Sequence, residues 1–196
     1  MILYNFEKTI LFIGIFFSLS FVNQATAQIE LSGTEIPSYL EINSKDTLQL
    51  FGAGAREILW LDVYLVVIYF NESDYNSEEL ILSNKTMGLR LYMKSSLVSK
   101  KRIKMAIERG FNKSTQGNYK KYKTRIEQMI DSFEEEIYKN DVIDLIYFPS
   151  EETRFYKNNQ YLGTIQGADF KQALFGIWLS EHAVDKDLKE DLLKGI

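Results

Sequence analysis

The chain has 196 residues, of which 45% are hydrophobic and 14% aromatic, and its formal net charge is −4. It contains no cysteine and a single histidine, so disulfides, thiol catalysis and a histidine-rich zinc site are excluded. The acidic balance also argues against a nucleic-acid partner, because binding to phosphates depends on basic residues.

The first 27 residues have the layout of a secretory signal peptide. Lys8 closes a short charged region, residues 9–21 form an apolar run, and "ATA" at 25–27 is a small-x-small cleavage site. The apolar run is shorter than the ~20 residues that a spanning helix needs, although an uncleaved anchor is the alternative. We expect residues 28–196 to form one exported domain, periplasmic if the host is a Gram-negative bacterium.

Short strand patterns fill the first part of this domain and return after a helical middle. The predicted strands cover residues 38–42, 47–51, 58–70, 86–95, 141–148, 153–158 and 160–165. The glycine-rich residues 52–54 are interpreted as a tight turn between two of these strands. The pair Asn158-Asn159 predicts a two-residue hairpin turn.

Apolar residues at helical spacing predict three helices before the last one. Their stripes are Ile103, Ala106, Ile107, Gly110 and Phe111; Tyr122, Ile126, Met129, Ile130, Phe133 and Ile137; and Phe170, Ala173, Leu174, Ile177 and Trp178. Asp185 is placed to cap a short final helix that carries Leu188, Leu192 and Leu193. The order of strands and helices indicates an α+β domain, with helices packed against a large antiparallel sheet.

Several sites of common chemistry have no counterpart in the sequence. The "GAG" at 52–54 is too short for a dinucleotide or phosphate-binding loop. The acidic runs at 134–136 and 151–152 are interpreted as solvated faces, and His182 as a surface residue. We therefore expect no cofactor and no metal, and assign no catalytic residue.

The apolar run at 58–70 carries charge where charge is costly. Arg56 precedes it and Asp62 lies within it, and a charge in a half-buried sheet needs a partner or a ligand. In a regular strand, alternate residues share a face. Leu59, Leu61, Val63, Leu65 and Val67 would then form an aliphatic face under the helices. The other face would carry Arg56, Ile58, Trp60, Asp62, Tyr64, Val66, Ile68 and Phe70, a mixture typical of ligand pockets.

Two interpretations of Arg56 follow. Its planar fork of donors suits a carboxylate or enolate oxygen, and the Tyr64 hydroxyl can add another donor. One hypothesis is therefore a guanidinium left free in an apolar recess to bind an anion. The alternative is an ion pair with Asp62 that fastens the sheet. A bulge or turn between Arg56 and Trp60 would also break the alternation.

Basic residues are concentrated in one helical segment. Ten lie between positions 100 and 125 against the single acid Glu108. They are Lys100, Lys101, Arg102, Lys104, Arg109, Lys113, Lys120, Lys121, Lys123 and Arg125. This segment could make peripheral contact with an anionic membrane surface or attract an anionic ligand. The alternative is a solvated face complemented by the acidic residues of the next segment.

Two stretches carry a resemblance to a known family. "LFGAGAREILWLDVYLVVIYF" at 50–70 and "YLGTIQGADFKQALFGIWLS" at 161–180 closely resemble the chalcone isomerase superfamily, in particular its bacterial exported chalcone isomerase-like members. The similarity runs from about residue 29 to residue 195. It implies an open-faced β-sandwich, in which a cleft lies between a large antiparallel sheet and a layer of helices.

The resemblance also implies a function. In the plant enzymes the arginine that Arg56 matches orients a substrate for ring closure, whereas other members bind fatty acids through this arginine and a tyrosine. Tyr64 falls where the enzymes carry threonine and the fatty-acid-binding members carry tyrosine. Tyr119 and Tyr122 are both possible counterparts of a further tyrosine of the enzymes. We expect a non-catalytic binder of a fatty acid or similar amphipathic carboxylate; the alternative is an intramolecular lyase of the chalcone isomerase type.

Overall fold

The computed structural model describes residues 29–59, 61–72, 76–96, 100–133 and 136–194. The predicted signal peptide at 1–27 and the acids Glu134 and Glu135 lie outside this part of the chain. The strands are β1 (Ile29–Leu31), β2 (Thr34–Ile36), β3 (Tyr39–Glu41), β4 (Thr47–Ile58), β5 (Leu61–Tyr69), β6 (Met87–Met93), β7 (Val142–Phe148), β8 (Glu152–Lys157) and β9 (Gln160–Gln166). The helices are α1 (Ser77–Leu82), α2 (Lys100–Ser114), the 3₁₀ helix η1 (Tyr119–Tyr122), α3 (Lys123–Ser132), α4 (Ala168–Leu179) and α5 (Lys186–Leu193).

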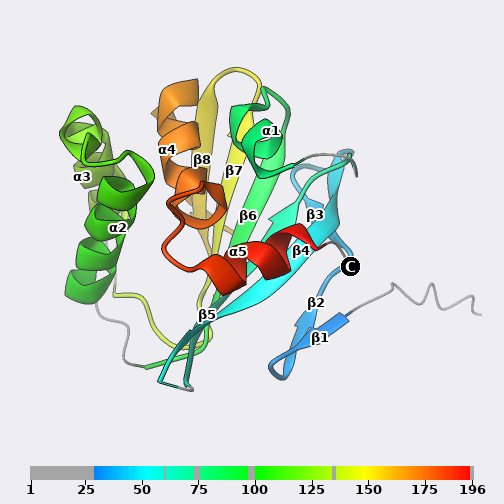
Figure 1. The fold of residues 1–196 in the computed structure, drawn as a ribbon. Helices are drawn as coiled ribbons and strands as arrows, with labels where there is room; N and C mark the ends of the chain where they lie inside the picture. The colour runs from blue at the N-terminus through cyan, green and yellow to red at the C-terminus, as the bar shows by residue number, and fades with distance from the viewer. Residues whose placement is uncertain (1–28, 60, 73–75, 97–99, 134–135, 195–196) are drawn as a thin grey trace, which may run out of the picture.

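Strands β3 to β9 form one antiparallel sheet in which neighbours in space are also neighbours in sequence (Figure 1). Such a sheet needs only tight turns or excursions between adjacent strands. The predicted turn between β8 and β9 is confirmed, because Asn158 and Asn159 both have positive φ angles, of 50° and 66°. Asparagine tolerates this left-handed region better than most residues do.

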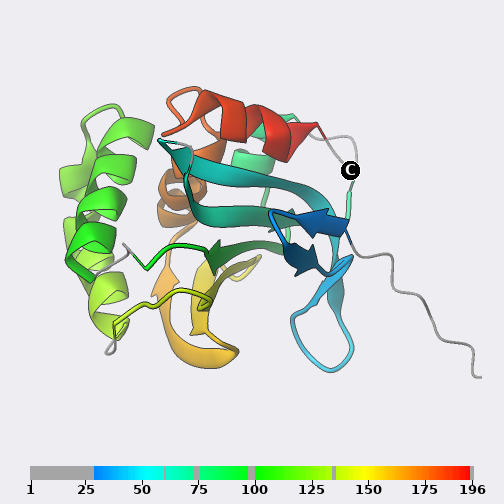
Figure 2. The ribbon, with the colours of Figure 1, turned by 90° about the horizontal axis from the view of Figure 1, so that it is seen from below.

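The helices and a small hairpin lie on opposite sides of the sheet. Figure 2 shows α4 and α5 over one face, with α2 and α3 at one side, and the β1–β2 hairpin against the other face. The α+β class and the large antiparallel sheet with a layer of helices are thereby confirmed. No helix within the described part of the chain is both long and apolar enough to cross a membrane.

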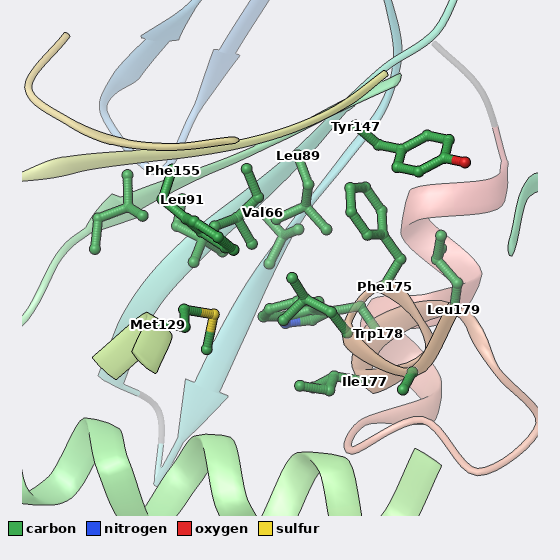
Figure 3. Packing of buried hydrophobic residues seen from close by; sticks show 14 of the residues in the cluster. Val66, Leu89, Leu91, Met129, Tyr147, Phe155, Phe175, Ile177, Trp178 and Leu179 are labelled. Carbon is green, nitrogen blue, oxygen red and sulfur yellow. The ribbon is translucent and has the colours of Figure 1, made fainter. Parts of the chain in front are cut away.

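Two apolar clusters fill the two sides of the sheet. The main cluster joins the helices to the sheet, and Figure 3 shows Met129 and Trp178 facing Val66 and Leu91. The second cluster lies beneath the N-terminal segment. Its buried members are Ile36, Leu40, Leu48, Leu65, Val67, Tyr69 and Ile146. Both faces of the central strands are therefore removed from water, which explains why β5 is apolar on both sides.

The predicted continuous strand at 58–70 is wrong at its beginning. Strand β4 runs through the glycines at 52–54 to Ile58, so these glycines do not form the predicted turn. The chain reverses after Ile58, where Leu59 has a positive φ of 50°, and β5 begins at Leu61. Position 60 lies outside the described residues.

The predicted assignment of faces is also wrong. Leu65 and Val67 belong to the cluster under the N-terminal hairpin, whereas Val66 and Ile68 pack beneath the helices. Leu59 is 82% exposed and belongs to neither cluster. The alternation holds along β5, but it could not show which of two apolar faces the helices cover.

Other predictions needed smaller corrections. The stripe predicted from Tyr122 to Ile137 is helical only to Ser132, although Phe133 and Ile137 remain buried after the helix ends. Helix α1 and the β1–β2 hairpin were not predicted, because both are too short to show a clear period. His182 is exposed, as predicted.

Candidate functional site

The glycines of β4 bring the last helix onto the sheet. A Cβ atom on Gly52 would lie 2.0 Å from the backbone oxygen of Leu192, and one on Gly54 would lie 2.7 Å from Cδ1 of Leu188. These residues thus have no side chain because α5 occupies the space above them. The close approach places the beginning of α5 beside Arg56, two residues further along β4.

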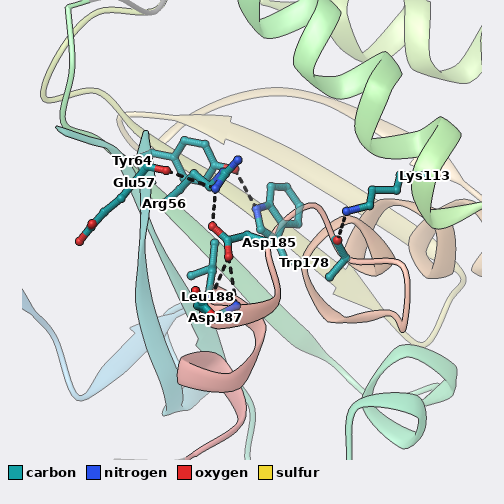
Figure 4. A network of polar contacts seen from close by, with 9 residues as sticks. Arg56, Glu57, Tyr64, Lys113, Trp178, Asp185, Asp187 and Leu188 are labelled. Carbon is teal, nitrogen blue, oxygen red and sulfur yellow. Dashed lines mark hydrogen bonds and ion pairs between the residues drawn. The ribbon is translucent and has the colours of Figure 1, made fainter. Parts of the chain in front are cut away.

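Asp185 joins this helix to Arg56 through its two carboxylate oxygens (Figure 4). Oδ1 accepts hydrogen bonds from the backbone N–H groups of Asp187 at 3.1 Å and Leu188 at 3.3 Å, so Asp185 caps α5 as predicted. Oδ2 forms an ion pair with Nη1 of Arg56. The same Nη1 donates a hydrogen bond to the backbone oxygen of Glu57 at 3.2 Å.

Neither sequence interpretation of Arg56 is correct in detail. Its guanidinium is not free, because Asp185 pairs with it. Its partner is also not Asp62, which lies opposite Glu57 in the β4–β5 pairing. The prediction that Arg56 and Asp62 share a face of one strand is wrong, because the chain turns between them and places them on different strands.

The Arg56–Asp185 pair is only partly withdrawn from water. The Arg56 side chain is 26% exposed and that of Asp185 is 18% exposed. Water at this depth screens part of the attraction, so the pair lies between a surface ion pair and a buried one. A solute that reaches the site can therefore compete for the guanidinium without entering a closed core.

Tyr64 lies beside Arg56, as predicted, but for a different reason. The two residues are direct partners across the β4–β5 hairpin rather than neighbours along one strand. The Tyr64 hydroxyl accepts a hydrogen bond from Nε1 of Trp178 at 3.2 Å. Burial raises the pKa of Tyr64 above its ordinary value of 10.0, so the phenol is neutral at physiological pH. Its own O–H proton can be donated to a ligand oxygen.

Tyr119 and Tyr122 belong to the helical side of the main cluster, against which Tyr64 also packs. Both lie in η1, and Tyr119 packs as a partly buried residue against the main cluster. Tyr122 is buried, with its ring centroid 6.0 Å from that of Phe111 and 5.2 Å from the guanidinium carbon of Arg125. These contacts give Tyr122 a packing role in the helical layer.

A fully buried cation lies on α4. Lys171 is 1% exposed, and its Nζ donates to the backbone oxygens of Leu80, Ile81 and Ser83 at 2.9, 2.8 and 2.8 Å. These oxygens are at the end of α1, where carbonyl groups lack partners within the helix. Burial lowers the pKa of Lys171 to about 8.

The sequence interpretation missed these partners of the predicted residues. Asp185 was expected only as a helix cap, Trp178 only as part of an apolar stripe, and Lys171 received no role. The one signal for Lys171 was its position within a strongly apolar helix. For Asp185 no local signal exists, because the contact with Arg56 spans 129 residues.

A separate pocket of about 490 Å³ lies on the opposite face of the sheet, next to β3. Its charged lining residues are Glu41, Arg90 and Asp144, and Arg90 donates two hydrogen bonds to Asp144, of 2.6 and 2.9 Å. Among the described residues, the only cation that lines this pocket, Arg90, is already paired with Asp144, so it is not available to a carboxylate. We therefore place the candidate site at Arg56.

The comparisons with known proteins agree with this architecture. The sequence profile of the family described as chalcone isomerase-like matches residues 27–194. The crystal structure of a fatty-acid binding protein from Arabidopsis thaliana is similar, with a TM-score of 0.70 and 16% sequence identity over 85% of this chain and 95% of that chain. At this identity the likeness shows the fold alone. No curated protein matches the sequence.

The family resemblance drawn from residues 50–70 and 161–180 is thus confirmed by a match over nearly the whole domain. The seven-stranded antiparallel sheet with its helical layer is the corresponding fold. The chain belongs to the chalcone isomerase-like family.

Proposed function

We propose that this protein binds a fatty acid or a similar amphipathic carboxylate without transforming it, with Arg56 and Tyr64 holding the head group. The observation that carries the proposal is their pairing across β4 and β5. A permanent cation and a neutral phenol thus stand side by side at the edge of an apolar core. Together they can bind a carboxylate through charge-assisted hydrogen bonds.

The surroundings of this pair suit an apolar tail. Tyr64 pairs across β5 and β6 with Met93, and Trp178 brings the indole of α4 against the Tyr64 hydroxyl. Met129 lies close to Trp178 in the same layer (Figure 3). Methionine side chains repack readily, so this part of the core can adapt to an inserted chain. Each buried CH₂ group would contribute about 0.8 kcal/mol to binding.

A fatty-acid binding protein with the same fold supports a binding role rather than a catalytic one. That ligand belongs to the Arabidopsis protein, and its transfer to this chain depends on Arg56 and Tyr64. The specific fatty acid is part of the proposal and has to be identified by experiment.

Native mass spectrometry of protein purified from its own host should reveal a co-purified fatty acid. Titration of the delipidated protein with a long-chain fatty acid should then show saturable binding that Arg56→Ala abolishes. Tyr64→Phe should weaken binding about 10- to 100-fold, the worth of one hydrogen bond to a charged group. Arg109→Ala is the matched control, since it removes an exposed arginine from α2. Equal affinity of wild type and Arg56→Ala would refute the proposal.

The alternative activity is the ring closure of a chalcone, in which Arg56 would stabilise developing oxyanion charge. The same purified protein should be mixed with a 2′-hydroxychalcone and flavanone formation followed by absorbance. Acceleration well above the spontaneous rate, lost in Arg56→Ala, would replace the binding proposal with that of an intramolecular lyase.

We further propose that the protein is exported and meets lipids at an anionic membrane surface through residues 100–125. Lys101, Lys104 and Arg109 of this segment are exposed. Lys121 and Arg125 instead pair with Asp169 of α4, at 3.0 and 2.8 Å, and not, among the described residues, with the acidic segment that follows them in the sequence. The membrane contact therefore rests on α2, and absence of co-sedimentation with vesicles that contain an anionic lipid would refute it.

A further inference from the structure

Arg56 already holds a carboxylate, that of Asp185, which is the same chemical group as the head of the proposed ligand. From this we propose that Asp185 is a specificity-determining residue: an internal competitor that every incoming carboxylate must displace from Arg56. The inference rests on the proposed function, because it concerns the affinity of that same site.

The geometry of the pair differs from that of two other arginine–carboxylate pairs among the described residues. Arg90 binds Asp144 through Nε and Nη2, at 2.6 and 2.9 Å. Arg125 binds Asp169 through Nη1 and Nη2, at 2.8 and 2.9 Å. These are two-point contacts, in which the planar fork matches both carboxylate oxygens.

Asp185, in contrast, reaches Arg56 through Oδ2 and Nη1. Its Oδ1 is turned towards the backbone N–H groups of Asp187 and Leu188. The carboxylate is thus divided between two tasks and gives the guanidinium one oxygen. A free carboxylate can offer both oxygens, so it can form the two-point contact that Asp185 does not form.

Displacement does not require α5 to unfold. If Oδ2 leaves Arg56, Oδ1 can still cap the helix. The segment before Asp185 is held independently, because Nζ of Lys113 donates to the Ala183 oxygen at 2.6 Å and the Val184 N–H donates to the Ile177 oxygen at 2.9 Å (Figure 4). A change in the Asp185 side chain is therefore sufficient to admit the ligand.

Because Asp185 competes for Arg56, a carboxylate ligand needs a minimum binding free energy to displace it. A tethered group competes at an effective concentration in the millimolar range or above. A short carboxylate such as acetate has only its head group to offer and is outcompeted. A long-chain fatty acid adds the burial of its tail, which lets it displace Asp185. The pair Arg56–Asp185 thus selects carboxylates by the length of the apolar chain attached to them.

The test compares two variants that remove the same charge from the same helix. Asp185→Asn keeps a good helix cap but loses the charged partner of Arg56, whereas Asp187→Asn changes an exposed residue two positions away. Asp185→Ser, also a good cap, serves as a second variant because its shorter side chain cannot retain an amide contact with Arg56. Urea denaturation establishes that all variants are folded.

Calorimetric titration with saturated fatty acids of decreasing length should show about tenfold or greater tightening in Asp185→Asn and Asp185→Ser, and none in Asp187→Asn. The shortest acid that binds measurably should also become shorter. The affinity for a fatty alcohol with the same tail should not increase in the Asp185 variants, because the alcohol carries no charge to compete for Arg56.

Two outcomes separate this inference from the proposed function. If wild type binds fatty acids and both Asp185 variants bind them no more tightly, the competitor role is overturned while the proposed function stands. If neither wild type nor the variants bind any carboxylate, the proposed function fails and the inference fails with it.

Discussion

Arg56 and Lys171 each place a cation against the end of a helix, but their partners differ in kind. Arg56 meets the side chain of Asp185 at the start of α5, where both groups keep some exposure to water. Lys171 meets three backbone oxygens at the end of α1 and is buried completely. The first partner is a single carboxylate that can rotate away, whereas the second is the main chain itself.

This difference suggests which cation is structural and which is available for binding. The carbonyl groups around Lys171 cannot leave without unfolding the end of α1, so this contact is permanent. Asp185 can release Arg56 and still cap α5 through its other oxygen. A protein that must keep its fold while it exchanges ligands needs both kinds of contact.

The largest effect is expected from Lys171→Met, which leaves three buried carbonyl groups without a donor. The variant should lose about 2–4 kcal/mol of unfolding free energy, measured by urea denaturation. Lys104→Met, on the exposed surface of α2, is the control and should change stability by about 0.5 kcal/mol or less. Equal stability of the two variants would show that Lys171 is not a structural lock.

The same two proteins allow a test by pH. Burial lowers the pKa of folded Lys171 from the ordinary 10.5 to about 8. Between these values the unfolded chain binds a proton that the folded protein has released, so stability rises with pH. Wild type should therefore gain stability relative to Lys171→Met from pH 8 to pH 10, and show no such trend below pH 8. If the unfolding free energies of wild type and Lys171→Met changed in parallel with pH, the lowered pKa of Lys171 would be contradicted.

An intermediate effect is expected from Gly52→Ala, which changes no charge. Its Cβ would meet the backbone oxygen of Leu192 at 2.0 Å, so α5 must move. The loss of stability should be about 1–3 kcal/mol, with faster hydrogen exchange in α5 than in α1. Gly163→Ala is the control, because its nearest neighbour is an ordinary contact at 3.7 Å. Unchanged exchange in α5 would refute the role given to Gly52.

The smallest effect is expected from removing the partner of Arg56. Asp185→Ala should cost about 1 kcal/mol, because the cap of α5 is lost, and Asp185→Asn only a few tenths, because asparagine also caps well. Thermal or urea denaturation of both variants measures the difference. If Asp185→Asn lost as much stability as Lys171→Met, the two cations would be equivalent and Asp185 would be a lock rather than an exchangeable partner.

Much of the fold could be predicted from patterns that are local. The Asn158-Asn159 turn, the cap at Asp185 and the helical stripes each depend on a few neighbouring residues, and the structure contains them, although the second stripe is helical only to Ser132. The order of these elements was enough for the α+β class. The family resemblance added the form of the sheet and its helical layer.

The predictions that were wrong concerned features that depend on residues distant in the sequence. The run at 58–70 is apolar on both faces, so nothing local shows that the N-terminal hairpin covers one face. The glycines at 52 and 54 suggest a turn when seen alone, and only the position of α5 explains them as a helix contact. Leu59, an aliphatic residue at a positive φ angle, gave no sign of the chain reversal.

The candidate site shows the same division. Arg56 and Tyr64 were selected correctly as neighbours, and their residue types indicated an anion. The ion pair of the Arg56 guanidinium could not be predicted from the sequence, because its partner, Asp185, is brought to it only by the position of the final helix. Charge in an apolar stretch predicts that a partner exists, but it does not identify the partner.

The separation of 129 residues between Arg56 and Asp185 has a consequence for the order of folding. A contact between such distant positions closes a very large loop, so it forms after the sheet that both ends rest on. Until α5 docks on the sheet, Arg56 therefore has no carboxylate of Asp185 beside it. If the proposed function holds, a fatty acid present during folding would meet a guanidinium that has no internal competitor.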